Sequence, residues 1–185
     1  MGYITKTNGK NEDYLKRTND KIYTPLKISK MIIDSLPIKE EDVLYDPFYG
    51  NGSFYEQFPK QNKSYFSEID LGKDFFEFET KVDWIISNPP YSIFDDVLKH
   101  SFNIAENVVY LIPANKIFAS MNRIRQTLNY GNIKEMRLIS ASKCGFPFGF
   151  PCVSIWIKKN YKGSTEIKLM ENKDTSKDAS LFSLF

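Results

Sequence analysis

The sequence predicts a single α/β domain built on a mostly parallel, twisted sheet with helices on both faces. Two observations predict this class. Short apolar runs typical of buried strands alternate along the chain with longer stretches whose apolar residues recur at helical spacing. Several of these runs stop at Gly, Pro, Asp or Asn, which places polar side chains at the ends of strands. A length of 185 residues fits one domain with its own core.

The first expected element is a helix with Thr24 as its N-cap and Pro25 as its first residue. Its apolar residues give one buried face through Ser35, and Pro37 ends it. The backbone N–H groups at the start of such a helix favour a carboxylate, although an ordinary capped core helix would read the same. The preceding residues 1–21 are polar and basic, and we interpret them as a flexible arm.

A short strand at 43–45 comes next, followed by the turn 46–54, which reads Asp-Pro-Phe-Tyr-Gly-Asn-Gly-Ser-Phe. A strand, a glycine-containing turn and a short helix are how α/β folds hold a cofactor at the carboxyl edge of the sheet. The glycines let the backbone approach a ligand closely. Asp46 could take a cationic amine, since the turn matches neither of the common phosphate-binding motifs. Gly-x-Gly by itself also fits an ordinary tight turn.

A second strand is expected at 64–68 and ends in an acid. Glu68 is placed to accept hydrogen bonds from ribose hydroxyls, as in nucleotide-binding α/β folds. Ile69 would then lie against an adenine ring, Asp74 could accept from the adenine amine, and Phe75 could line that pocket. A surface Glu at the end of a strand is the simpler alternative.

The strand at 82–87 stops at Asn88-Pro89-Pro90-Tyr91, because proline fixes φ and cannot continue a ladder. An aromatic exocyclic amine, such as N6 of adenine, is a poor nucleophile because its lone pair is delocalised into the ring. The side-chain oxygen of Asn88 and the carbonyl of Pro89 could accept both amine hydrogens and aim the lone pair at an activated methyl group. Tyr91 could stack on the base. A plain surface turn is the alternative.

The rest of the chain alternates helix and strand. We expect helices at 93–105 and 117–128 and strands at 108–112, 133–139 and 153–158. The composition of residues 165–170 also allows a further strand. The loop before the strand at 153–158 carries Phe146 and Phe148 between Gly and Pro residues, which suits base stacking or a hydrophobic turn packed on its own hairpin. Polar residues then dominate. The expected division is an arm at 1–21, a catalytic domain at 22–159 and a polar tail at 160–185.

Composition excludes several classes of protein. The formal net charge is +2, from 25 Lys and Arg against 23 Asp and Glu, so strong nonspecific binding of nucleic acid is not expected. No apolar run approaches 18 residues and the N-terminus lacks an apolar signal region, so neither a membrane span nor secretion is expected. Cys144 and Cys152 are interpreted as reduced thiols of an intracellular, cytoplasmic protein. With one His, the chain predicts no metal site.

Together these motifs resemble the S-adenosylmethionine-dependent DNA amino-methyltransferases of the adenine-N6 type, over roughly residues 22–158 and in the motif order of the gamma group. Asn88 to Tyr91 matches the catalytic (Asp/Asn/Ser)-Pro-Pro-(Tyr/Phe) of that family. The turn 46–54 resembles its cofactor motif, with Tyr49 where Cys is frequent. Phe148 best matches the second stacking aromatic, and Phe146 is the alternate.

The resemblance implies a role for each matched residue. The implied catalytic residues are Asn88, Pro89, Pro90 and Tyr91, and the implied base-stacking residues are Tyr91, Phe148 and Phe146. The implied cofactor-binding residues are Tyr23, Thr24 and Pro25 at the methionine end, with Asp46, Pro47, Phe48, Gly50, Gly52, Glu68, Ile69, Asp74 and Phe75. The implied fold is Rossmann-like, with an antiparallel hairpin at the end of the sheet.

The implied reaction is methyl transfer from S-adenosylmethionine to adenine N6 in single- or double-stranded DNA, with the base flipped out of a duplex. Three alternatives remain: the same chemistry on RNA, a protein glutamine methyltransferase, and a non-catalytic methyltransferase-like subunit. The glutamine enzymes share Asn-Pro-Pro-Tyr but resemble Asp-x-Gly-x-Gly-x-Gly at the cofactor turn, which the turn 46–54 does not match.

Two departures from the family pattern affect the expected partners. The helix that usually separates the ribose-binding acid from the adenine-binding Asp is almost absent, since only residues 69–73 join Glu68 to Asp74. The target-recognition domain is also missing, because only a short polar stretch follows the last clear strand. Specificity would then be weak or borrowed, which slightly favours a dimer or a partner protein that supplies target recognition.

Overall fold

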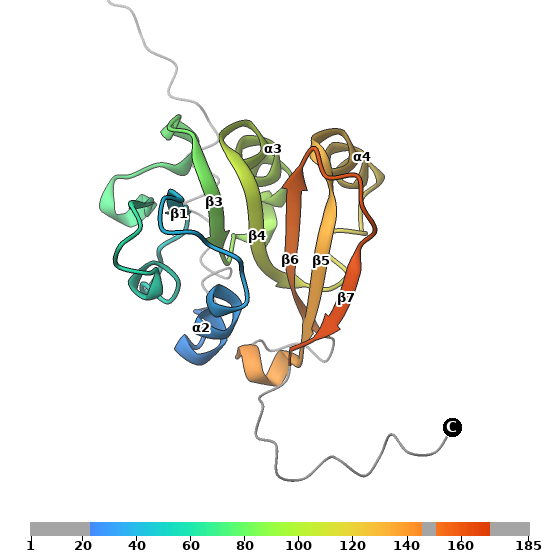
Figure 1. Ribbon diagram of the computed structural model, residues 1–185, viewed down its shortest axis with the longest axis horizontal. Helices are drawn as coiled ribbons and strands as arrows, with labels where there is room; N and C mark the ends of the chain where they lie inside the picture. Colours follow the sequence, from blue (N-terminus) through green and yellow to red (C-terminus); the bar gives the residue numbers. More distant parts are fainter. Residues whose placement is uncertain (1–22, 146–150, 171–185) are drawn as a thin grey trace, which may run out of the picture.

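The computed structural model describes residues 23–145 and 151–170 (Figure 1). Within them, seven strands form one sheet in the order β2-β1-β3-β4-β6-β5-β7. Their bounds are β1 (Leu44–Asp46), β2 (Ser64–Phe66), β3 (Val82–Ser87), β4 (Ala105–Pro113), β5 (Gly131–Ile139), β6 (Cys152–Lys159) and β7 (Glu166–Leu169). β6 is antiparallel to β4 and β5, and every other pairing is parallel. The expected mostly parallel sheet with a terminal hairpin is confirmed.

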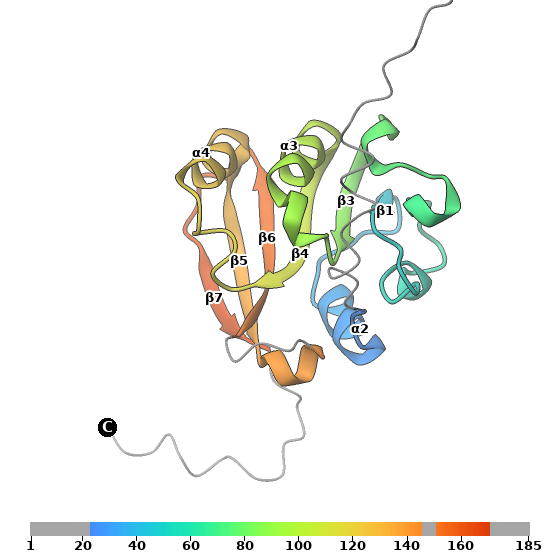
Figure 2. The same cartoon turned by 180° about the vertical axis from the view of Figure 1, so that it is seen from behind.

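In the described part of the chain, three α-helices pack on the two faces of the sheet: α2 (Leu26–Asp34), α3 (Phe94–Ile104) and α4 (Met121–Tyr130). Figures 1 and 2 show α3 and α4 together on one face. Leu98 of α3 belongs to a buried cluster with Ile85 on that side. Ile32 of α2 packs in a second cluster with Trp84 and Val109, whose side chains point to the opposite face because side chains alternate along a strand. Helices on both faces are therefore confirmed.

The first helix begins later than the sequence predicts. Thr24 was expected as its N-cap, but helical structure starts at Leu26 and Pro25 occupies the cap position without a side-chain hydrogen bond. The carbonyl of Pro25 accepts from the amides of Ile28 and Ser29 at 2.9 and 3.2 Å. The expectation that Thr24 caps the helix is wrong. The residue is only 3% exposed, and its hydroxyl accepts a hydrogen bond from the side-chain N–H of Asn88 instead of one from the helix.

The start of another helix also differs from expectation. The helix expected at 117–128 is α4, which begins at Met121 because the Ser120 hydroxyl accepts from the amide of Arg123 at 3.4 Å and caps it. The further strand that the composition allowed at 165–170 is β7, which pairs in parallel with β5 at the edge of the sheet.

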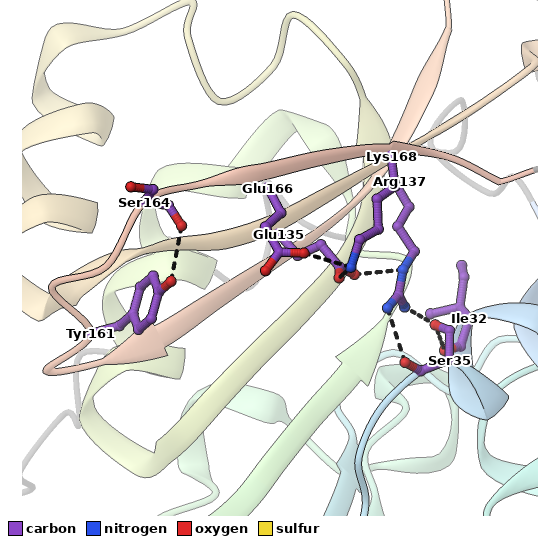
Figure 3. A network of polar contacts seen from close by, with 8 residues as sticks. All are labelled: Ile32, Ser35, Glu135, Arg137, Tyr161, Ser164, Glu166 and Lys168. Atoms are coloured by element: carbon purple, nitrogen blue, oxygen red, sulfur yellow. Dashed lines mark hydrogen bonds and ion pairs between the residues drawn. The ribbon is translucent and has the colours of Figure 1, made fainter.

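A partly buried ionic network connects the outer strands to the end of α2 (Figure 3). Glu135 on β5 pairs with Arg137 and with Lys168 of β7, each at 2.5 Å. Arg137 in turn donates to the Ser35 carbonyl at 2.9 Å and to the Ser35 hydroxyl. A cation that binds the last carbonyls of a helix also complements the helix dipole. The network therefore fixes the C-terminal end of α2 to the sheet.

Replacing Glu135 with Ala is expected to lower the free energy of unfolding by about 3 kcal/mol, because the guanidinium of Arg137 would stay largely buried without its carboxylate. The side chains of Glu135 and Arg137 are only 8% and 13% exposed. Urea denaturation measures the change. Glu166→Gln on β7 is the control, since Glu166 is 58% exposed and should leave the midpoint unchanged. Equal midpoints for both variants would contradict this account.

Candidate active site

The carboxyl ends of β1, β2 and β3 bring three sequence-predicted polar residues to one edge of the sheet. Asp46 ends β1, Glu68 follows β2, and Asn88 follows β3. β1 lies between β2 and β3 and is parallel to both. The connection after β1 leads to β2 on one side of it, and the connection after β2 crosses back to β3 on the other side. Such a reversal of strand order is the switch point where open α/β sheets bind ligands.

Asp46 is the most deeply buried of these groups, with 0% exposure. One carboxylate oxygen accepts from the Ser87 hydroxyl at 2.6 Å and from the Phe48 amide at 3.2 Å. The other accepts from the Tyr55 amide at 3.2 Å. The carboxylate thus joins the end of β1 to the end of β3 and closes the turn after β1. In this structure its oxygens face protein donors.

Burial raises the pKa of Asp46 to about 7, and the hydrogen bonds from Ser87, Phe48 and Tyr55 oppose that rise. The ordinary value is 3.8, so between the two values the folded state binds more protons than the unfolded state. The contribution of Asp46 to stability is therefore full below about pH 4 and is lost as pH rises through about 7.

We expect the free energy of unfolding of the wild type, relative to Asp46→Asn, to fall between about pH 4 and about pH 7 and to level off above that. The Asn variant carries no titrating group at this position, so the difference isolates Asp46 from the other carboxylates. Urea denaturation across the pH range measures it. A difference that stays flat, or that rises with pH, would exclude a raised pKa for this carboxyl.

The turn after β1 is braced from two sides. Gly50 has φ of 55°, a left-handed conformation that favours glycine, and its amide donates to Glu68 at 2.8 Å. A Cβ on Gly50 would lie 3.3 Å from ring atoms of Tyr23, so this ring covers the turn. The hydroxyl of Ser53 donates to the Thr24 carbonyl at 2.7 Å. Tyr23 and Thr24 are therefore neighbours of Gly50 and Glu68, although the three stretches are far apart in the sequence.

The segment after β2 folds into two single-turn 3₁₀ helices, η3 (Ile69–Leu71) and η4 (Phe75–Glu77). Glu68 caps the first by accepting from the Asp70 amide, and Asp74 caps the second by accepting from the Phe76 amide at 2.9 Å. Phe75 is buried, and its ring lies 5.1 Å from that of Phe48 in the turn after β1. The two stretches matched to cofactor binding are thus in contact.

Asn88 lies between two hydroxyl groups. Its side-chain oxygen accepts from the Tyr91 hydroxyl at 2.9 Å, and its side-chain N–H donates to the Thr24 hydroxyl at 3.3 Å. Pro89 is buried, while Asn88 and Tyr91 are half-buried. The motif therefore lies at the end of a buried strand. The side-chain amide of Asn88 is held by Thr24, just before α2, and by Tyr91, just before α3.

The aromatic loop falls partly outside the described residues, and Phe146 and Phe148 with it. Both flanks of the loop are described. A Cβ on Gly145 would lie 3.8 Å from Pro25, and the carbonyl of Pro151 accepts from the Ala114 amide at 3.0 Å. The loop therefore starts beside the start of α2 and returns at the end of β4.

Sequence reasoning missed two serines. Ser87 links Asn88's strand to Asp46, and Ser53 links the turn after β1 to Thr24. Both are buried, at 0% and 4% exposure. Ser87 could have been found as the last residue of a strand that ends at the same edge as Asp46, whereas nothing in the sequence singles out Ser53.

Among residues 23–145 and 151–170, no three His, Cys, Asp or Glu side chains gather closely enough to hold a metal ion. No helix in the same part of the chain is both long and apolar enough to cross a membrane. Cys144 and Cys152 are free, fully buried thiols. A hydrogen bond between them lowers the pKa of Cys144 and raises that of Cys152.

The fold is shared with solved methyltransferase structures. A type I restriction-modification methyltransferase subunit from Streptococcus thermophilus matches at 18% identity and a TM-score of 0.57, over 76% of this chain and 45% of that one. A protein assigned as a class I S-adenosylmethionine-dependent methyltransferase from Listeria monocytogenes matches at 10% identity and 0.62, over 83% and 67%. A dimethyladenosine transferase from Plasmodium falciparum matches at 16% identity and 0.55, over 74% and 62%.

These similarities confirm the Rossmann-like methyltransferase fold, and at such identities they establish the fold alone. No protein-family model matches the sequence, and no curated protein matches it either. The chain spans less than half the length of the restriction-modification subunit.

Proposed function

We propose that this chain transfers a methyl group from S-adenosylmethionine to the exocyclic N6 amine of adenine in DNA. One observation carries the proposal. The Asn88 amide, held by hydroxyls of Tyr91 and Thr24, lies at the same sheet edge as the glycine-containing turn, and Thr24 contacts both. An acceptor for amine hydrogens is thereby placed beside the turn that resembles a cofactor site.

The residues at this edge fit S-adenosylmethionine. Glu68 is a carboxylate at the end of β2, where it can accept from a ribose, and its bond to Gly50 joins it to the turn. Phe48, which is half-buried and packs on the buried Phe75, offers aromatic surface for adenine. Tyr23, which covers Gly50, is 54% exposed and can contact the methionine end. Asp46, which is fully buried, acts on the cofactor through the turn that it fixes.

The chain prepares the acceptor amine by hydrogen bonding. The side-chain oxygen of Asn88 and the carbonyl of Pro89 accept the two N6 hydrogens, which draws the nitrogen toward tetrahedral geometry and frees its lone pair from the ring. A side-chain amide oxygen can accept two hydrogen bonds, so the bond from Tyr91 is compatible with one from the amine. Most of the rate comes from holding the amine in line with the methyl group.

S-Adenosylmethionine, when bound, supplies an electrophilic methyl group whose bond to sulfur breaks as its bond to N6 forms. Methylation leaves N6 positively charged, and one N6 proton then passes to water. No strong general base is needed for that step. Asn88 stabilises the charge that develops on N6 because its oxygen carries the negative end of the amide dipole.

The adenine ring is held by stacking. Tyr91 forms one side of the stack, and Phe148 or Phe146 of the aromatic loop forms the other. In a duplex, the base must leave the helix to reach Asn88. The name of one structural neighbour, a dimethyladenosine transferase, agrees with an adenosine acceptor.

Target recognition is proposed to come from a second chain, either another copy or a partner protein. The formal net charge of the chain, +2, provides little general attraction for phosphates.

Transfer of a labelled methyl group tests the proposal. Wild-type protein is offered single-stranded DNA, duplex DNA, RNA and a protein extract, and the products are digested to identify the modified residue. N6-methyladenine in DNA is the expected product. Labelled methyl groups in RNA would support the same mechanism with RNA as the substrate. Labelled methyl groups on protein glutamine would refute the nucleic-acid proposal. Bound cofactor with no transfer to any substrate indicates a non-catalytic subunit.

A further inference from the structure

The side-chain amide of Asn88 is held at both ends by residues far apart in the sequence. Its oxygen accepts from Tyr91, three positions along, and its N–H group donates to Thr24, 64 positions before it. The Thr24 side chain belongs to a residue only 3% exposed, so the hydroxyl meets Asn88 in a largely dry environment. A hydrogen bond made away from water orients its partners more firmly than one at the surface.

Thr24 is itself held in place by its own carbonyl and by α2, which follows it. Its carbonyl accepts from the Ser53 hydroxyl at 2.7 Å, so it is attached to the turn after β1. The next residue, Pro25, caps α2. The far end of α2 is secured by Arg137, which donates to the Ser35 carbonyl (Figure 3). The Thr24 hydroxyl is therefore presented from a rigid support.

We propose that Thr24 is a positioning residue for methyl transfer, whose hydroxyl holds the Asn88 amide at the angle that aims its oxygen at the acceptor amine. This inference rests on the proposed function. It differs from the contact with the methionine end that the family resemblance implies for Thr24. The hydroxyl acts on the acceptor side of the reaction, through Asn88.

The physical reason lies in the last torsion of an Asn side chain. Rotation about the bond between Cβ and the amide carbon has broad minima, so the amide plane swings unless it is held at more than one point. Loss of the Thr24 hydroxyl removes one of the points that hold the amide plane, so the direction of the Asn88 oxygen would be less well defined. In-line transfer depends steeply on such geometry, and small misplacements far from the reacting atoms cost large factors in rate.

The test compares Thr24→Val with Thr24→Ser. Val replaces the hydroxyl by a methyl group of similar size and keeps the backbone carbonyl that Ser53 needs. Ser keeps the hydroxyl and loses a methyl group. We expect Val to lower the single-turnover rate of methyl transfer about tenfold, with cofactor affinity by calorimetry within about twofold of wild type. Ser is expected to restore the rate to within about threefold.

Three results would overturn the inference. The first is a Val variant as fast as wild type, the second is a Ser variant as slow as Val, and the third is a Val variant that is slow only because it binds the cofactor weakly and regains the wild-type rate at saturating cofactor. If the wild type methylates nothing, the proposed function has failed separately. The side-chain NH₂ signal of Asn88 in ¹⁵N spectra then decides, since it should shift in Val and stay in Ser. An unshifted signal in Val refutes the contact.

Discussion

Replacement of Asn88 by Ala is expected to slow methyl transfer by about 10²- to 10³-fold and to leave cofactor affinity within about twofold of wild type. The variant removes the side-chain oxygen that would accept an N6 hydrogen. The strand that precedes it is unchanged, because Ser87 still bonds to Asp46 through its own hydroxyl. The loss should therefore fall on the rate with bound substrate and spare the cofactor site.

Single-turnover transfer of a labelled methyl group measures the rate, and calorimetry measures the affinity for S-adenosylmethionine. Asn115→Ala is a matched control, because Asn115 is an exposed Asn on the segment that follows β4 and should keep the wild-type rate. Full activity of the Asn88 variant would remove Asn88 from the mechanism. Equal losses in both variants would instead indicate a general effect of truncating Asn at this edge.

The effects expected at Asn88 and Thr24 should rank in a fixed order. Asn88→Ala removes the acceptor itself, whereas Thr24→Val loosens its orientation and leaves it present. The first loss should thus exceed the second by at least about tenfold. Combining the two should cost little more than Asn88→Ala by itself, since Thr24 has no amide left to hold.

The arrangement of the strand ends could be predicted from the sequence because it depends on local signals. Apolar runs that stop at a polar residue predict where a strand ends, and parallel strands end at one edge. Asp46, Glu68 and Asn88 were each predicted at such an end. The structure brings them together, with Asp46 bonded to Ser87 beside Asn88 and Glu68 bonded to Gly50.

The hydrogen bonds that connect these strand ends could not be predicted, because they join distant small polar side chains. Ser53 reaches Thr24 across 29 positions, and Asn88 reaches it across 64. Any Ser or Thr can donate or accept, so the residue type does not reveal the partner. The same holds for Glu135, whose partners come from β5 and β7.

Asp46 shows how burial changes the interpretation of a motif. Its position at a strand end predicted a carboxylate that takes a cationic amine. The structure gives it 0% exposure and three protein donors, from Ser87, Phe48 and Tyr55. Burial therefore favours a role for Asp46 in closing the turn over a direct contact with the cofactor, and substitutions test that role against one for its charge.

Replacement of Asp46 by Ala is expected to weaken S-adenosylmethionine binding by about tenfold to hundredfold, or about 1.4 to 2.8 kcal/mol. It is also expected to lower the free energy of unfolding by about 3 kcal/mol, because the Ser87 hydroxyl and two backbone amides lose a buried acceptor. Calorimetry measures the first effect and urea denaturation the second. An Ala variant with wild-type affinity would separate Asp46 from the cofactor site altogether.

Asp46→Asn distinguishes the two roles. Asn keeps the shape and one acceptor oxygen, so it should retain most of the affinity if Asp46 acts by holding the turn. If Asp46 acts through its negative charge, Asn should bind as weakly as Ala. Since burial raises the pKa of Asp46 to about 7, the wild type at about pH 6 is largely protonated and resembles Asn at this position. The turn-holding role therefore also predicts that wild-type affinity changes little between about pH 6 and about pH 8, whereas a charge role predicts that it falls as the pH is lowered.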